Sequence, residues 1–107
     1  MSYKKALEKF ESTPIKDQVL IRHEFFIDTP VGFDCCTVGF LTKPLRNQYL
    51  SDTNYPLLLN FLNETYGITS IEAEKLMTVN DFFIGTTADR FKHMLKFLQE
   101  QVKLENE

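Results

Sequence analysis

The sequence predicts a mostly helical α+β domain, with a short β-hairpin or strand pair near residues 18–34 packed on about four helices. Apolar residues recur with a helical period at the N-terminus and through the second half of the chain, whereas they alternate with polar residues between positions 18 and 28. A turn sequence with Pro and Gly follows the alternating stretch. A chain of 107 residues is long enough to form one hydrophobic core and too short for two. We therefore expect a single domain over residues 1–107.

The first expected helix lies at the N-terminus and is amphipathic. Its apolar residues fall at positions i, i+3, i+4 and i+7, namely Tyr3, Ala6, Leu7 and Phe10. We expect Thr13-Pro14 to end this helix, because the residue before a proline disfavours helical geometry.

A strand is predicted over residues 18–28, where apolar and polar side chains alternate. One face of this strand is expected to carry Val19, Ile21, His23, Phe25 and Ile27. His23 is therefore expected in the middle of an apolar face. The following segment, TPVG, predicts a turn in which Pro30 fixes φ and Gly32 is available for a positive φ.

Residues 35–43 fit two secondary structures. Their Val, Phe, Thr and Cys side chains suit a strand, which would form a longer hairpin by pairing 33–41 with 19–27. Asp34 is also a suitable cap for a short helix that carries Cys35, Val38 and Leu41 on one face. We favour the helix.

Two helices are predicted between residues 55 and 80. The first occupies 55–66 and ends at Gly67, since glycine adopts the left-handed conformation that terminates helices. The second opens with a capping box from Thr69 to Glu72. Its expected core stripe consists of Ile71, Leu76 and Val79.

The last predicted helix begins with a second box, from Thr86 to Asp89. Its polar face is expected to hold His93, and its tail, residues 104–107, is expected to fray. The residues expected to face the core are Ala88, Phe91, Met94, Leu95, Leu98 and Val102.

The charge balance excludes several classes of partner. The chain carries 12 Lys and Arg against 15 Asp and Glu, a net charge of −3. Proteins that bind nucleic acid neutralise phosphates with basic side chains, so we expect no direct nucleic-acid partner.

The sequence has no apolar run of about 18 residues and no signal-peptide pattern. These features predict a cytoplasmic protein without a membrane partner.

The two cysteines, Cys35 and Cys36, are adjacent in the sequence. A disulfide between neighbouring cysteines is strained, so we expect reduced thiols. We favour burial in the core, packed between Phe33 and Phe40, because free cysteine is among the most buried residue types.

Two chemical roles are the alternatives for these thiols. In a thiol enzyme one cysteine would be the nucleophile and His23 the base, and either Asn80 or Asp81 would orient the base. With His23 and His93 the cysteines also make four potential zinc ligands, but adjacent cysteines lack the spacing of zinc sites. We expect neither a metal nor a cofactor.

Four aromatic residues are candidates for a binding surface, because aromatic side chains are enriched where binding energy concentrates. These residues are Tyr49, Tyr55, Phe82 and Phe83. The run Phe82-Phe83-Ile84 lies between two predicted helices and either fills the core, which we favour, or forms an exposed docking patch. No glycine-rich phosphate loop and no Gly-x-Ser-x-Gly motif occurs, so the sequence indicates no nucleotide or acyl-transfer site.

The segments FDCCTVGFL and EKLMTVNDFFIGTTADRFKHMLKFLQE, within residues 18–100, resemble a group of small phage and prophage proteins. In that group a CCLGVL-like segment precedes an LxxLND segment and a final amphipathic helix. The positions that carry the resemblance are Phe33, Cys35, Cys36, Gly39, Leu41, Leu76, Asn80, Asp81 and Phe91. The chain departs from the group at Thr37-Val38, where an aliphatic residue followed by Leu or Gly is usual. The resemblance implies a phage accessory protein and assigns no catalytic residue.

We therefore expect a small non-enzymatic protein that binds and modulates a host protein, located in the host cytoplasm. The alternative is a thiol-dependent enzyme that uses Cys35 or Cys36 with His23. The sequence predicts neither the identity of the partner nor an oligomeric state.

Overall fold

The computed structural model describes residues 3–49 and 54–106 of the chain. Over these residues five helices and one two-stranded antiparallel hairpin pack into a single globule, which confirms the mostly helical α+β class. The elements are α1 (Lys4–Glu11), β1 (Phe26–Thr29), β2 (Gly32–Cys35), α2 (Thr37–Leu41), α3 (Tyr55–Tyr66), α4 (Ser70–Phe82) and α5 (Thr87–Glu105), with short 3₁₀ segments at Ile15–Asp17 and Lys43–Gln48.

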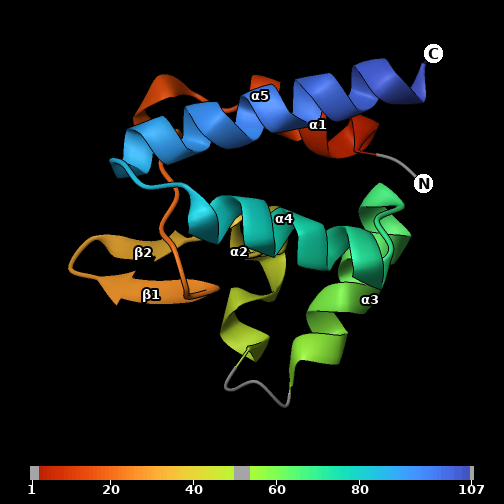
Figure 1. Cartoon of the computed structure of the whole chain (residues 1–107). Helices are drawn as coiled ribbons and strands as arrows, with labels where there is room; N and C mark the ends of the chain where they lie inside the picture. Colours follow the sequence, from red (N-terminus) through yellow and green to blue (C-terminus); the bar gives the residue numbers. More distant parts are fainter. Residues whose placement is uncertain (1–2, 50–53, 107) are drawn as a thin grey trace.

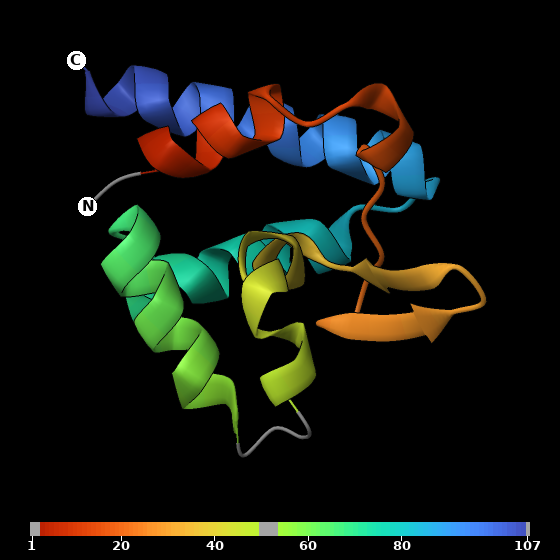
Figure 2. The same ribbon diagram turned by 180° about the vertical axis from the view of Figure 1, so that it is seen from behind.

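The helices are arranged around α4. Helix α1 lies along α5, and α4 contacts α5 on one side and α2 and α3 on the other (Figures 1 and 2). The hairpin projects from the globule beside α2, and the described ends of the chain lie close together at the opposite end (Figure 1).

Three buried phenylalanines join the helices that lie far apart in the sequence. The ring of Phe10 on α1 lies 4.8 Å from that of Phe40 on α2 and 4.7 Å from that of Phe91 on α5. Phe40 and Phe91 complete the cluster at 5.8 Å. All three side chains are at most 2% exposed, so this cluster forms the centre of the core.

The predicted helix signals are confirmed at their ends. Gly67 ends α3 with a φ of 72°, and Thr69 and Glu72 form the reciprocal capping box of α4. At the start of α5 only half of the predicted box is found: the Thr86 side chain accepts a hydrogen bond from the Asp89 backbone N–H. Helix α5 continues to Glu105, two residues into the segment expected to fray, and residue 107 lies outside the described residues.

The predicted core face of α4 is wrong in part. Ile71 is 77% exposed, while the buried positions are Ala73, Leu76 and Asn80. These three follow the i, i+3, i+7 spacing of one helix face, whereas Ile71 and Leu76 are five residues apart and cannot share it. Asn80 escaped the prediction because a polar residue gives no apolar signal.

The core face of α5 follows the prediction with one exception. Phe91, Met94 and Leu98 are buried, but Ala88, in the first turn of the helix, is exposed. The face also buries a charged residue, Arg90, which an apolar pattern does not reveal.

The predicted strand over 18–28 is wrong except at its end, because only Phe26–Thr29 pairs in the sheet. Residues 20–23 run as irregular chain past α4 and α5 (Figure 1). His23 is not in an apolar face. Its side chain is 63% exposed, and its φ of 68° is the only positive value among the described residues other than glycine.

The hairpin is short and its turn matches the prediction. Phe26 pairs with Cys35 and Thr29 with Gly32, so Pro30-Val31 forms the connection and Gly32 has a φ of 145°. The longer hairpin, 33–41 paired with 19–27, does not form. The helix favoured for this region is present as α2, but it begins after Cys36 because Asp34 and Cys35 belong to β2.

Gly39 allows α2 to pack against the chain before β1. A Cβ atom at this position would lie 1.9 Å from the Phe25 carbonyl oxygen and 2.8 Å from the Cβ of Cys35. Such contacts are impossible for real atoms, so only glycine permits this approach.

A buried polar network connects α2, α4 and residues 20–21. The Asn80 Oδ1 atom accepts hydrogen bonds from the Thr37 backbone N–H (3.1 Å) and hydroxyl (2.8 Å), and Asn80 Nδ2 donates to the Ile21 carbonyl (2.9 Å). Arg90 is 3% exposed and donates to the carbonyls of Asn80 (3.0 Å), Leu20 (3.3 Å) and Phe83 (2.8 Å). The network therefore satisfies the carbonyls of residues 20–21, whose N–H groups donate to the carbonyls of Thr87 and Cys35.

Replacing Asn80 with Ala should lower the free energy of unfolding by about 2–4 kcal/mol, because it leaves the Thr37 N–H and the Ile21 carbonyl unpaired, at roughly 1–3 kcal/mol for each buried group. Urea denaturation measures the change. Asn60→Ala, at an exposed site in α3, is the matched control and should change stability by less than about 0.5 kcal/mol. Equal effects of the two substitutions would contradict the role of the network.

Candidate functional site

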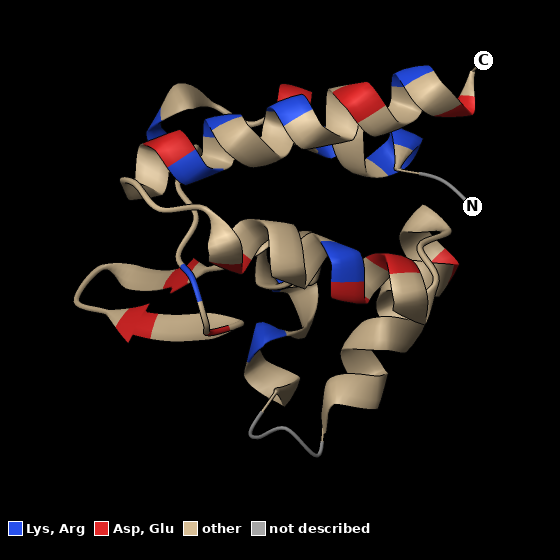
Figure 3. Ribbon diagram, in the orientation of Figure 1, with Lys and Arg blue, Asp and Glu red and all other residues tan. Residues whose placement is uncertain are grey.

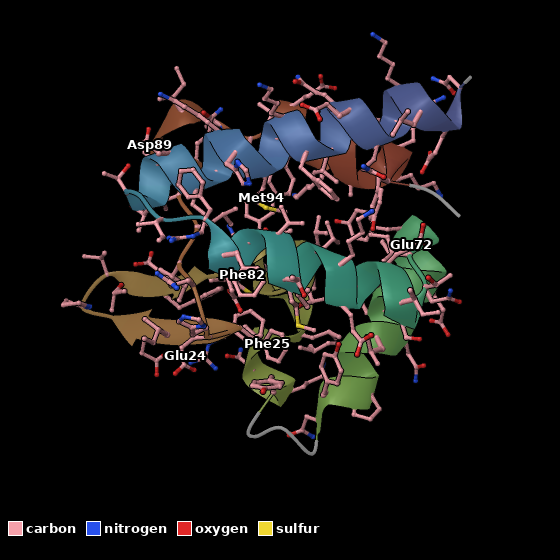
Figure 4. The ribbon with its side chains drawn as sticks, in the orientation of Figure 1. Glu24, Phe25, Glu72, Phe82, Asp89 and Met94 are labelled. Carbon is pink, nitrogen blue, oxygen red and sulfur yellow. The ribbon has the colours of Figure 1, made fainter. Side chains whose placement is uncertain are left out.

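A small pocket lies between α4 and the chain that leads into β1. Its volume is about 120 Å³, well below the roughly 300–1,000 Å³ of typical small-molecule sites. The lining residues are His23, Glu24, Phe25, Cys36, Tyr49, Met77 and Asp81. Figure 4 shows Glu24 and Phe25 on the side of α4 near its C-terminal end, where Phe82 also lies.

The pocket brings together the three residue types of a thiol catalytic site. Asp81, one turn after Met77 on α4, lies beside His23: the His23 Nδ1 atom is 3.7 Å from Asp81 Oδ2, and the His23 backbone N–H donates to Asp81 Oδ1 at 3.0 Å. Cys36 lines the same pocket. The sequence offered Asp81 as one of two residues that could orient the base, and in the structure Asp81 lies beside His23.

The hydrogen bonds of His23 do not lead to the cysteine. In a catalytic triad one imidazole nitrogen faces the carboxylate and the other takes the proton of the nucleophile. Here the second nitrogen, His23 Nε2, accepts a hydrogen bond from Arg22 Nε at 3.0 Å. Within the described part of the chain, no hydrogen bond connects His23 to Cys36.

Both thiols are buried, as predicted, and are protonated at neutral pH. Burial raises the pKa of Cys36 to about 12, and the nearby backbone N–H groups of Gly39 and Val38 offset only part of this effect. Burial also raises the pKa of Cys35 to about 11, against the opposing effect of Lys43. Because the thiolate is the reactive form, neither residue has the properties of a nucleophile.

The four potential zinc ligands are not gathered in one place. His93 stacks on the ring of Phe83 at 4.6 Å, in a groove on the α5 side of α4, whereas His23 lines the pocket. Within residues 3–49 and 54–106, no group of three or more His, Cys, Asp or Glu side chains is arranged to hold a metal ion.

Two of the four aromatic binding candidates are packed rather than exposed. Tyr55 stacks on Phe25 at 5.4 Å, and its hydroxyl lies 4.0 Å from the sulfur of Met77. Tyr49 meets the same Phe25 ring edge-on at 5.4 Å. Both tyrosines are half-buried, so they support the pocket wall instead of forming a free surface.

The core position favoured for the run Phe82-Phe83-Ile84 is wrong for Phe82 and Ile84 and holds only in part for Phe83. Phe83 is half-buried on His93, and its carbonyl accepts the hydrogen bond from Arg90. Phe82 is 79% exposed and Ile84 is 84% exposed. We call these two exposed side chains the Phe82 ridge.

Open grooves lie on both sides of the ridge. The apolar groove faces α5 and is lined by Thr78, Val79, Phe82, Phe83, Ile84 and His93. The acidic groove faces the pocket and is lined by His23, Glu74, Met77, Thr78, Asp81 and Phe82. The apolar run Phe82-Phe83-Ile84 indicated the ridge from the sequence. No sequence pattern indicated Met77 or Glu24, because only the tertiary structure brings them to the site.

The chain matches no protein-family model, no curated protein and no solved structure. None of the helices that the structure describes is long and apolar enough to cross a membrane.

In the native protein, neither cysteine should react with iodoacetamide at neutral pH, because both thiols are buried and protonated. Both should react once the protein is unfolded in urea. Mass spectrometry of the alkylated protein distinguishes the two states. Rapid modification of one native cysteine would contradict the packing role.

The thiols should also make stability fall at alkaline pH. Their pKa values rise on folding from 9.0 to about 11 for Cys35 and about 12 for Cys36, so the unfolded chain ionises first and stability falls from about pH 9 up to those values. Each thiol contributes roughly 1.4 kcal/mol per pH unit in that window and nothing well below pH 9. Urea denaturation across this range measures the free energy of unfolding, which should fall less with pH in the Cys35→Ala/Cys36→Ala variant than in the wild type. Parallel pH curves for the two proteins would contradict the raised pKa values of the thiols.

Proposed function

We propose that the chain is a small non-enzymatic protein that binds and modulates another protein, and that it acts as a phage accessory factor on a host protein. The observation that carries this proposal is the Phe82 ridge. A helix normally exposes polar residues and buries apolar ones. Helix α4 buries Asn80 and exposes Phe82, the reverse of that pattern.

The ridge has the features of a binding surface. A large aromatic side chain with grooves on both sides offers apolar area that a partner removes from water, at about 1.5–3 kcal/mol for each large apolar side chain. Binding energy in protein interfaces is concentrated in a few such residues. Because this exposure gives the isolated chain no packing energy, a partner accounts for it better than folding does.

Most of the positions that carry the resemblance to phage proteins lie in the core, whereas the ridge lies on the surface. Of the residues that carry it, Cys35, Cys36, Gly39, Leu41, Leu76, Asn80 and Phe91 are buried. These residues hold α2, α4 and α5 together, whereas Phe82 and Ile84 lie outside the shared positions. The resemblance thus supports a common scaffold, and the ridge supplies the binding specificity of this chain.

A thiol-dependent enzyme is the second candidate, favoured by the presence of His23, Asp81 and Cys36 at one pocket. The raised pKa of Cys36 and the Arg22 bond to His23 count against it. A Cys36→Ala variant that retains binding would separate the two candidates, since a nucleophile is indispensable to its reaction.

The proposed function can be tested by affinity capture from a bacterial lysate with wild-type and Phe82→Ser proteins as bait. We expect a specific protein on the wild type and at least about a tenfold loss on Phe82→Ser, which corresponds to about 1.4 kcal/mol. The matched control is Leu104→Ser, because Leu104 is 61% exposed near the far end of α5. Equal thermal melts would show that all three proteins are folded. Retention of the captured protein by Phe82→Ser would overturn the proposal.

A further inference from the structure

The acidic groove continues into the small pocket. The two share His23, Met77 and Asp81, so a chain that lies along α4 in the groove can extend one side chain into the pocket. The pocket, at about 120 Å³, has room for the end of a side chain and not for a typical small-molecule ligand of roughly 300–1,000 Å³.

Carboxylates dominate the charge of this surface. Glu74 lies in the groove, Glu24 in the pocket, and Asp81 in both. In the portion of the chain that the structure describes, Glu24 and Glu74 form no ion pair, and Asp81 is paired only with His23, at 3.7 Å. Figure 3 shows acidic positions on α4 and beside the start of β1, with basic positions among them.

The buried Arg90 interacts electrostatically with Asp81, but among the described residues no cation forms an ion pair with Glu24 or Glu74. The Arg22 Nε–H group donates a hydrogen bond to His23 Nε2. The Lys75 ammonium lies 5.8 Å from the centre of the Phe97 ring, on the side of α4 that faces α5. An acidic surface repels the phosphates of nucleic acids and lipids, so the charge favours a basic segment of a protein.

The walls of the groove also suit the stem of a basic side chain. Lysine and arginine pack their methylene groups on apolar surfaces while the charged end seeks polar partners. Met77 and Phe82 supply such a surface, and methionine adapts readily to different partners. In the pocket, Phe25 and Tyr49 line the wall and add aromatic surface on which the stem can pack.

From these observations we infer the chemistry of the partner, an inference that rests on the proposed function. The partner segment inserts a lysine or arginine side chain through the acidic groove into the pocket, toward Glu24 and Asp81. An adjacent apolar residue of the segment packs against the Phe82 ridge. The ridge supplies affinity and the carboxylates select the basic residue.

Selection of a random displayed peptide library on the immobilised wild-type protein tests this inference. We expect the enriched peptides to carry Lys or Arg next to an aromatic or aliphatic residue, and to bind more weakly as salt is raised. Fluorescence anisotropy then gives the affinity of one enriched peptide for each variant. Phe82→Ser tests the ridge, and the double variant Glu24→Lys/Glu74→Lys tests the charge.

The charge-reversed variant should bind the peptide about tenfold more weakly, and a peptide with Glu in place of its basic residue should recover part of this loss. The matched control, Glu64→Lys/Glu100→Lys, has the same net charge and changes exposed carboxylates on α3 and α5, so it should bind within about twofold of wild type.

The outcomes separate this inference from the proposed function. If binding depends on Phe82 but not on Glu24 and Glu74, the Phe82 ridge is supported as the binding surface and the inference of a basic partner segment is overturned. If no enriched peptide depends on Phe82, the proposed binding surface itself is overturned. Enriched peptides that depend on Phe82 but lack Lys and Arg would likewise contradict the inference.

Discussion

The contacts of Arg90 and Asn80 determine how the rest of the structure is assembled. A buried guanidinium is costly unless its donors are paired. Within the described residues, Arg90 hydrogen-bonds to no carboxylate and instead donates to three backbone carbonyls, two of them at the C-terminal end of α4. That end carries the negative pole of the helix dipole, which favours a cation. Helix α5 is thereby fixed to α4 and to the chain at Leu20.

Asn80 completes this arrangement from the other side. Its amide joins the first residue of α2 to the carbonyl of Ile21, beside the backbone hydrogen bond from the Ile21 N–H to the Cys35 carbonyl. In the chain before β1, the carbonyls of Leu20 and Ile21 thus accept from side chains of α5 and α4, while their N–H groups donate to the carbonyls of Thr87 and Cys35. Buried backbone groups require such partners, whether they come from a strand or from elsewhere.

The candidate site follows from the same placement. Successive residues of a helix differ in direction by roughly 100°. Because Asn80 points into the core, Asp81 meets the backbone N–H of His23 at the pocket, and Phe82 projects into solvent. One helix turn thus supplies a structural residue, a pocket carboxylate and the ridge. The cysteines, in contrast, belong to the core that positions this turn, and their raised pKa values accord with packing.

The sequence by itself determined the features that depend on neighbouring residues. The capping box of Thr69 and Glu72, the stop at Gly67 and the turn at Pro30 and Gly32 are each made within a few residues, and all were predictable. The mostly helical α+β class and the burial of both cysteines were also predictable. Only the tertiary structure decided that residues 20–23 are not a strand, because their partners, Asn80, Asp81 and Arg90, lie about 60–70 positions away in the chain. It likewise decided which of Phe82 and Phe83 is exposed, since both fit either environment and the Arg90 bond to the Phe83 carbonyl sets the path of the chain after α4.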